Sequence, residues 1–317
     1  MRRIALLIIF LILVWTEPAR SQSDEEAPIK VSTILANVPV IVSDRTGKHV
    51  AGIKPEDFKI TSAGNPKEIV YFSDSEMPLS VAIVLDITGS VHAVLDGIKK
   101  AANEYVNQLG PDDKCMVVTF GNKVKVTEPF TSDKKRLAKE IKSIIGISGG
   151  IGLMNEAVLR VVQQEFAAIR GRKAIILLTD AGEINRGSTG RMLDELIEGD
   201  TVVYSIYYPT PHPWFLKGNA SMADLIKETP VGTLADIAAY SGGKLLVADG
   251  NDFSAQFQTI MDELKKMYVV GFYPEESADG SPNRITMDLV RPDLVIRTKK
   301  IIRPRTNLGD STPRKKQ

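Results

Sequence analysis

Cysteine and histidine are both scarce in this sequence. Cys115 is the only cysteine, so no disulfide can form within one chain, and its apolar surroundings, CMVVTF, predict a buried and unreactive thiol. His49, His92 and His212 are the only histidines, and their positions suggest no Ser-His-Asp catalytic arrangement. Without disulfides the fold must be held by a hydrophobic core, which the 43% content of hydrophobic residues makes feasible.

The sequence also lacks an excess of charge of either sign. Its 40 Lys and Arg residues nearly balance 39 Asp and Glu residues, which gives a formal net charge of +1. A nucleic acid or an anionic lipid surface is therefore disfavoured as the main partner. Beyond the N-terminal region no apolar run approaches the roughly 20 residues that a membrane-spanning helix requires.

The first 21 residues have the pattern of a secretory signal peptide. Arg2 and Arg3 form a basic region, Ile4 to Trp15 are apolar, and Ala19-Arg20-Ser21 has small residues at the positions of a cleavage site. We therefore expect cleavage after Ser21, a secreted or periplasmic location, and no membrane span in the mature protein. A retained N-terminal anchor is the alternative, although the apolar stretch is short for one.

Two β-rich segments flank a central segment in which strands and helices alternate. Residues 22–76 and 267–305 show the alternation of apolar and polar residues typical of strands, whereas residues 77–266 contain continuous apolar strands separated by helical patterns. This order predicts an α/β fold with a doubly wound, mostly parallel sheet, inserted between β segments that pair into one small sheet. Residues 306–317 form a polar tail that we expect to be disordered.

Within the central segment the residue pattern indicates specific elements. The Gly121-Asn122 turn predicts an antiparallel hairpin, and Ser132 is a candidate N-cap of a helix that runs to Ile145. Further helices are expected over residues 91–109, 154–169, 191–197, 233–240 and 253–266.

Two strands of the predicted sheet end in an aspartate. Asp86 closes SVAIVLD and is followed by the hydroxyl residues Thr88 and Ser90, and Asp180 closes AIILLTD. Ligands of such sheets bind beyond the carboxyl ends of the strands, where the strand order reverses, so we expect these four side chains to converge. An all-oxygen cluster of this kind suits a hard cation such as Mg²⁺.

This combination of motifs resembles the von Willebrand factor A domain and its metal-ion-dependent adhesion site. The similarity rests on the strand that ends in DITGS, the glycine-rich loop SGGIG at 148–152, and the strand that ends in TDAGE. The flanking segments VIVSDRTGKHVAGIKPEDFKIT and MYVVGFYP resemble a secreted bacterial subfamily first named from acidobacterial genomes. The resemblance implies a Rossmann-like domain and a Mg²⁺ or Mn²⁺ site, which an acidic residue of a protein partner completes. The implied ligands are Asp86, Thr88, Ser90 and Asp180.

The sequence departs from the family pattern in two places. Thr88 replaces the first serine of the Asp-x-Ser-x-Ser motif, which keeps the hydroxyl oxygen. The family's central threonine falls on Ile151 or Gly152, and neither has a side-chain oxygen. Either the site is vestigial or a nearby residue supplies the missing oxygen, the candidates being Asn155, Glu156 and Glu183.

A long connection, residues 207–232, leaves a predicted strand at the same edge of the sheet as the two aspartates. Trp214 and Phe215 in this connection are candidate partner-binding residues, because aromatic side chains are enriched at interface hot spots. The alternative is that both aromatic side chains pack against the protein itself.

Enzymatic interpretations of these motifs are weaker. Haloacid-dehalogenase phosphotransfer needs Asp-x-Asp, and Thr88 stands in place of the second acid. The glycines of SGGIG follow a helix and lack the Lys-Ser/Thr pair of a phosphate-binding loop. The sequence thus predicts a secreted, non-enzymatic protein that mediates protein–protein or surface interactions, with a degenerate divalent-metal adhesion site. A structural envelope component with a vestigial site and, more remotely, a metal-dependent phosphotransfer enzyme are the alternatives.

Overall fold

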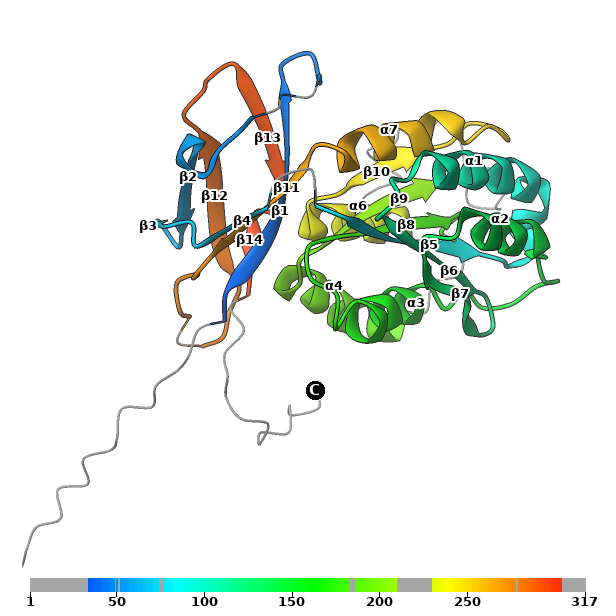
Figure 1. Cartoon of the computed structure of the whole chain (residues 1–317). Helices are drawn as coiled ribbons and strands as arrows, with labels where there is room; N and C mark the ends of the chain where they lie inside the picture. Colours follow the sequence, from blue (N-terminus) through cyan, green and yellow to red (C-terminus); the bar gives the residue numbers. More distant parts are fainter. Residues whose placement is uncertain are drawn as a thin grey trace, which may run out of the picture.

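A six-stranded sheet forms the centre of the larger part of the molecule (Figure 1). The computed structural model describes residues 34–48, 50, 52–73, 77–182, 186–209, 230–277 and 279–303. The sheet has the order β10-β9-β8-β5-β6-β7, in which only β7 runs antiparallel to its neighbour. Its strands are β5 (Leu79–Asp86), β6 (Lys114–Phe120), β7 (Val124–Thr131), β8 (Arg172–Thr179), β9 (Thr201–Tyr207) and β10 (Lys244–Val247).

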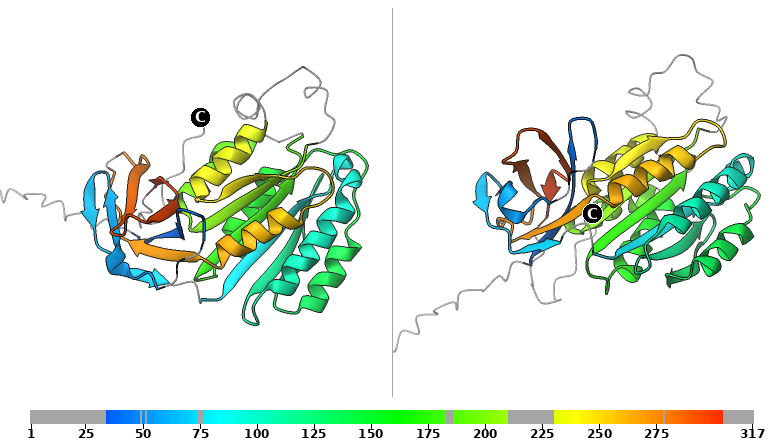
Figure 2. Two further views of the ribbon diagram at one scale, coloured as in Figure 1. Left: turned by 90° about the horizontal axis from the view of Figure 1, so that it is seen from above. Right: turned by 45° about the horizontal axis from the view of Figure 1, so that its top comes forward.

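Helices cover both faces of this sheet, which confirms the predicted doubly wound α/β fold (Figures 1 and 2). One face packs against α1 (Leu95–Gln108), α2 (Lys134–Ser143) and α7 (Ser254–Leu264). The other packs against α3 (Met154–Arg160), α4 (Thr189–Glu198) and α6 (Pro230–Ser241). Because both faces are covered, every residue of β8 and β9 is buried, as their continuous apolar sequences predict.

Three helix ends differ from the expected ones for local reasons. Asp133, rather than Ser132, is the N-cap of α2, and its Oδ1 accepts hydrogen bonds from the backbone N–H groups of Lys135 (2.9 Å) and Arg136 (3.1 Å). The helix expected over 154–169 is α-helical only to Arg160 and continues as a π-helical turn over Val161–Glu165. A 3₁₀ turn, Gly89–Ala93, separates β5 from α1.

The flanking β segments form two sheets rather than the single sheet expected. One has the order β13-β1-β11-β4 and the other β14-β12-β2-β3. Each sheet combines strands from both ends of the chain, as predicted, but each has one apolar face that a second sheet must cover. The two sheets therefore share one core. The strands are β1 (Ala36–Asp44), β2 (Phe58–Ser62), β3 (Asn65–Lys67), β4 (Tyr71–Ser73), β11 (Met267–Phe272), β12 (Asn283–Leu289), β13 (Leu294–Thr298) and β14 (Ile301–Ile302).

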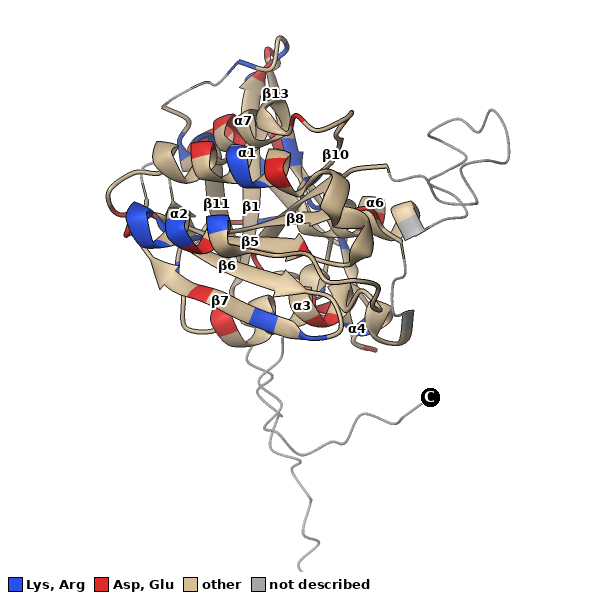
Figure 3. Ribbon diagram, turned by 90° about the vertical axis from the view of Figure 1, so that its right-hand side faces the viewer, with Lys and Arg blue, Asp and Glu red and all other residues tan. Residues whose placement is uncertain are grey.

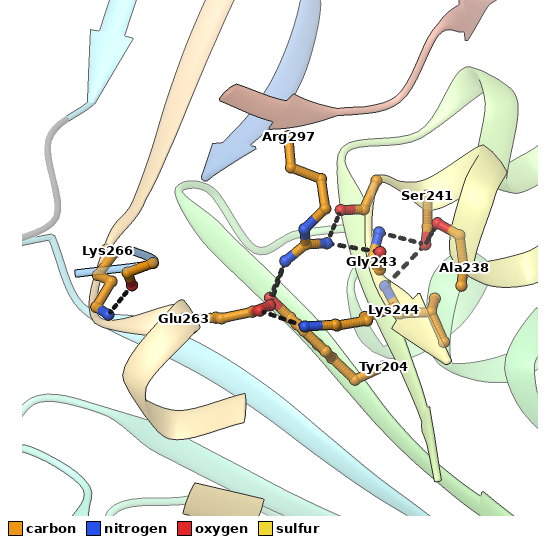
Figure 4. A network of polar contacts seen from close by, with 11 residues as sticks. Tyr204, Ala238, Ser241, Gly243, Lys244, Glu263, Lys266 and Arg297 are labelled. Carbon is orange, nitrogen blue, oxygen red and sulfur yellow. Dashed lines mark hydrogen bonds and ion pairs between the residues drawn. The ribbon is translucent and has the colours of Figure 1, made fainter. Parts of the chain in front are cut away.

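Arg297 on β13 ties this β-sandwich to the α/β part (Figure 4). Its guanidinium donates to the backbone carbonyls of Gly242 and Gly243, both at 2.6 Å, and pairs with the carboxylate of Glu263 on α7. It also lies over the ring of Tyr204, 5.7 Å from the ring centroid, as in a cation–π contact. These contacts involve β9, α7 and the turn after α6, so one side chain from the sandwich fixes three elements of the α/β part.

Lys299, immediately after β13, makes a second connection. Its side chain is buried, and Nζ donates to the carbonyls of Ile197 (2.8 Å) and Gly199 (2.5 Å) at the C-terminal end of α4. The last carbonyls of a helix carry partial negative charge, which stabilises an ammonium group there. None of the described helices has both the length and the apolar character needed to cross a bilayer.

Candidate metal centre

The two predicted acids end adjacent strands of the central sheet. β5 and β8 pair in parallel, with Leu85 opposite Leu178, so that Asp86 and Asp180 lie together beyond the carboxyl ends of these strands. The strand order runs outward from β5 in both directions, to β6 on one side and β8 on the other. This is the topological position at which α/β sheets bind ligands. Both aspartate residues are 3% exposed.

Hydroxyl groups hold the carboxylate of Asp86 in one orientation. Its Oδ1 accepts from the backbone N–H (2.8 Å) and the hydroxyl (2.7 Å) of Thr88, and its Oδ2 accepts from the hydroxyl of Thr179 (2.8 Å). The hydroxyl oxygens of Thr88 and Ser90 are 3.4 Å apart. Thr179 was not among the predicted site residues. The only signal for it was a hydroxyl residue at the end of an otherwise apolar strand.

The electrostatics of this cluster favour a cation. Burial raises the pKa of Asp86, and the nearby charge of Asp180 adds to this, whereas the hydrogen bonds from Thr88 and Thr179 act in the opposite direction. The cluster lines a cavity of about 440 Å³, and among the described residues no lysine, arginine or histidine side chain contributes to its wall. Within the described part of the chain, the two buried carboxylates therefore share a cavity without a positive side chain.

Residues 149–152 of the glycine-rich loop also line the cavity. Gly149 and Gly150 have φ angles of 69° and 117°, in the left-handed region that favours glycine. The backbone N–H of Ile151 donates to Oδ1 of Asn122 at 3.0 Å, and a Cβ atom on Gly150 would lie 2.9 Å from the same oxygen. Asn122 therefore fixes the loop at close range. Asn122 lies in the turn between β6 and β7, and its contact with the loop was not predicted from the sequence.

The position of the family's central threonine has no oxygen ligand here. Ile151 is 56% exposed, and Gly152 has no side chain. The proposed replacements lie elsewhere. Asn155 is buried with its Nδ2 donating to the hydroxyl of Thr189 (2.9 Å), and Glu156 accepts from the hydroxyl of Ser188 (3.1 Å). Neither residue lines the cavity, because both join α3 to the start of α4. Glu183, Trp214 and Phe215 lie outside the described residues.

The side chains that line the cavity match the preferences of a hard divalent cation. The described residues contain no cluster of three or more His, Cys, Asp or Glu side chains suited to a metal, so among these residues hydroxyl groups would have to complete the ligand set. Asp86, Thr88, Ser90 and Asp180 provide carboxylate and hydroxyl oxygens only, which fits Mg²⁺ or Mn²⁺ better than a softer ion. The set is one protein ligand smaller than the family pattern.

Two buried tyrosines lie at the carboxyl end of β9, the strand next to β8. Tyr207 ends β9 and Tyr208 follows it, and each is 1% exposed. Burial raises the pKa of both phenols, and the negative charge of Asp180 adds to the effect in each case. The ring of Tyr208 packs edge-on against Phe253 with centroids 6.0 Å apart, next to the start of α7. The two tyrosines belong to the hydrophobic cores on opposite faces of the sheet, and both phenols lie within reach of the charge of Asp180.

Comparison with known proteins supports the assignment of the α/β part. Residues 81–183 match the family model of the von Willebrand factor type A domain. A solved structure described as von Willebrand factor type A from Catenulispora acidiphila is similar with a TM-score of 0.50 and 10% identity, over 79% of this chain and 72% of that one. No curated protein matches the chain.

Two further solved structures are similar over shorter parts of this chain. BatB from Bacteroides thetaiotaomicron has 23% identity and a TM-score of 0.48, over 59% of this chain and 98% of its own. Proximal thread matrix protein 1 of the mussel byssus, solved with a zinc-occupied MIDAS motif, has 16% identity and a TM-score of 0.49, over 65% of this chain and 50% of its own. None of these comparisons distinguishes the acidobacterial-type subfamily. The matched segment begins in β5 and ends beyond Asp180, so it contains both acids, and the chain contains a von Willebrand factor type A domain.

Proposed function

We propose that this protein binds a protein partner through a divalent cation held by Asp86, Thr88, Ser90 and Asp180. The observation that carries the proposal is the pair of buried carboxylates in a cavity that no cationic side chain of the described residues lines. Burying like charges together is costly unless a counter-charge is present. An acidic side chain of the partner completes the site, since a bound divalent cation offers an open coordination position to a carboxylate oxygen.

Each of the four residues has a distinct part in this proposal. Thr88 and Ser90 present hydroxyl oxygens from the 3₁₀ turn, and Asp180 presents a carboxylate from the neighbouring strand. Asp86 acts through the orientation that Thr88 and Thr179 impose on its two oxygens. Water fills the position that the family's threonine would occupy, because Mg²⁺ usually retains several waters in protein sites.

We also propose that the protein is secreted or periplasmic and that it is not an enzyme. The pattern of residues 1–21 supports a secreted or periplasmic protein that keeps no membrane span after cleavage. A non-enzymatic role is supported by the second motif position, where Thr88 stands instead of the acid that phosphotransfer would need. A nucleic-acid partner is not supported, because the chain has nearly balanced charge.

One observation favours a second candidate, a structural envelope component with a vestigial site. Both oxygens of Asp86 already accept hydrogen bonds, three in total, so this carboxylate is satisfied within the protein. A domain of this kind would bind partners through its surface alone. Metal affinity separates the two candidates.

The test is calorimetric titration of the purified, EDTA-treated protein with Mg²⁺ and Mn²⁺. We expect saturable binding by the wild type and by the control Asp288→Asn, which removes an exposed charge on β12 of the sandwich. We expect no binding by Asp86→Ala. Absence of binding by the wild type up to millimolar metal would contradict the adhesion site and leave the vestigial one.

A further inference from the structure

The outer face of α2 carries an unpaired ridge of positive charge. Lys135, Lys139 and Lys142 are spaced i, i+4 and i+7, which places them on one side of the helix, and all three are exposed. None of them takes part in the ion pairs found among the described residues. Figure 3 shows blue segments following one another along α2. We refer to these three lysines as the lysine ridge.

The other two cations of α2 are used differently. Arg136 forms an ion pair with Glu128 at 2.5 Å, and Nζ of Lys134 donates to the carbonyl of Leu109 at 2.6 Å. These two side chains hold the helix against β7 and the end of α1. The ridge has no such role in the fold. Lys142 lies in the last turn, where a cation favours the helix dipole, but Lys135 is in the first turn and the like charges of Lys135 and Lys139 four residues apart weaken the helix slightly, so helix stability does not account for the whole ridge.

The ridge leads toward the metal cavity. α2 ends at Ser143, and the chain then continues directly into the glycine-rich loop that lines the cavity. The loop is anchored to the end of β5, because the backbone N–H of Ile147 donates to the carbonyl of Ile87 at 2.8 Å. The segment between α2 and α3 exposes two large apolar side chains to solvent, Ile145 at 76% and Ile151 at 56%.

We propose that the lysine ridge, Ile145 and Ile151 form a docking surface for an acidic polypeptide segment, one carboxylate of which enters the cavity. The cavity contact depends on the function proposed above, whereas the ridge contact does not need a metal. Charge complementarity assigns the partner class: three unpaired ammonium groups attract several carboxylates, and the two isoleucines accept apolar side chains between them.

An acidic segment fits this surface better than a nucleic acid or a membrane. The ridge is about 10 Å long at 1.5 Å per residue, which is too short to follow a phosphate backbone over several nucleotides. The loop that follows the ridge lines the cavity of the two buried carboxylates, whose negative charge disfavours a dense run of phosphates there. A membrane surface would find two exposed large apolar side chains, Ile145 and Ile151, among the described residues of this surface. A flexible acidic chain can place single charges along the ridge.

The probe is a fluorescently labelled decamer of glutamate, and its binding to the full protein is followed by anisotropy at low ionic strength, with Mn²⁺ or with EDTA. The test variant Lys135→Glu/Lys139→Glu/Lys142→Glu reverses the ridge. A matched control, Lys265→Glu/Arg284→Glu/Lys300→Glu, makes the same charge change at exposed sites on and near the sandwich. We expect the ridge variant to bind about tenfold more weakly or worse than the control, in both buffers, and the difference to shrink as salt is raised.

Metal titration of the ridge variant separates this proposal from the proposed function. We expect its Mn²⁺ affinity to equal that of the wild type, since no ridge lysine lines the cavity. The neutral variant Lys135→Gln/Lys139→Gln/Lys142→Gln repeats the test if charge reversal disturbs folding. Equal glutamate binding by the ridge and control variants would overturn the docking surface. Tighter binding of a short DNA duplex or of phosphatidylserine vesicles than of the decamer, at the same salt, would overturn the partner class.

Discussion

Thr179 donates its hydroxyl hydrogen to Oδ2 of Asp86 at 2.8 Å, across the two central strands of the sheet. Thr179 immediately precedes Asp180, so this bond links the strand end that carries Asp180 to the carboxylate of Asp86. It therefore connects the two halves of the proposed metal centre. It also satisfies a buried carboxylate oxygen, which makes it part of the fold as well as of the site.

Replacement of Thr179 by valine is therefore expected to affect both stability and metal binding. The variant leaves Oδ2 of a buried carboxylate without a donor, which should lower the free energy of unfolding by about 1–3 kcal/mol. Weaker Mn²⁺ binding should accompany this loss, because Asp86 loses one of the contacts that orient it. Chemical denaturation and calorimetry measure the two effects. Thr179→Ser keeps the donor and should stay near the wild type, and equal losses in both variants would contradict this account.

Gly150 provides a test of the site that leaves the acids untouched. Alanine at this position would combine a φ angle of 117° with a Cβ atom 2.9 Å from Oδ1 of Asn122, so the loop must shift. We expect Gly150→Ala to destabilise the protein by about 1–3 kcal/mol and to weaken Mn²⁺ binding. The control is Gly190→Ala near the start of α4, where nothing lies within 4 Å of the new Cβ and helix propensity improves. A loss in the control as large as that at Gly150 would argue against the steric explanation.

Arg297 and Arg291 allow a matched comparison at the sandwich. Arg297 contacts two carbonyls, Glu263 and the ring of Tyr204 at the junction, whereas Arg291 pairs only with the exposed Asp293 at 3.1 Å. Arg297→Ala should lower the unfolding free energy by about 1–3 kcal/mol, because the carbonyls of Gly242 and Gly243 lose this donor and Glu263 keeps only its ion pair with Lys244. Arg291→Ala should change it by less than about 0.5 kcal/mol. Thermal unfolding curves of both variants check this prediction, which fails if the two changes are equal.

Cys115 should be chemically silent in the folded protein. It is fully buried in β6, and burial raises the pKa of its thiol from the ordinary 9.0 to about 12. A raised pKa in the folded state means that this thiol contributes stability below pH 9, which is lost as the pH rises toward 12. At pH 8 a thiol reagent should react slowly with the native protein and rapidly after denaturation. Rapid reaction of the native protein would show that β6 opens readily.

The sequence predicted the parts of the site that depend on strand ends. Asp86 and Asp180 each follow an apolar strand, and parallel strands bring such residues to one edge, so their proximity could be expected. Thr179 and Asn122 could not be identified in this way. The role of Thr179 depends on which strand pairs with β5, and that of Asn122 on how the β6–β7 turn meets a loop some 29 residues away.

The same limit applies to the sandwich and to the helix ends. Pairing between the two ends of the chain was predictable, but the number of sheets depended on which apolar faces meet, and alternation within a strand does not encode that. Ser132 and Asp133 are both favourable N-cap residues, so residue type alone does not decide between them. The structure has Asp133 at the N-cap. The interpretations of residues 1–21, Trp214 and Phe215 stay predictions.

The central claim is that a divalent cation binds between β5 and β8, and crystals grown with MnCl₂ test it most directly. The anomalous signal of Mn²⁺ locates the ion without reference to any expected site. The account predicts one strong peak in the cavity, beside the side-chain oxygens of Asp86, Thr88, Ser90 and Asp180, and no such peak in Asp86→Asn. A map without a peak in the cavity, with Asp86 still bonded only to Thr88 and Thr179, would contradict it.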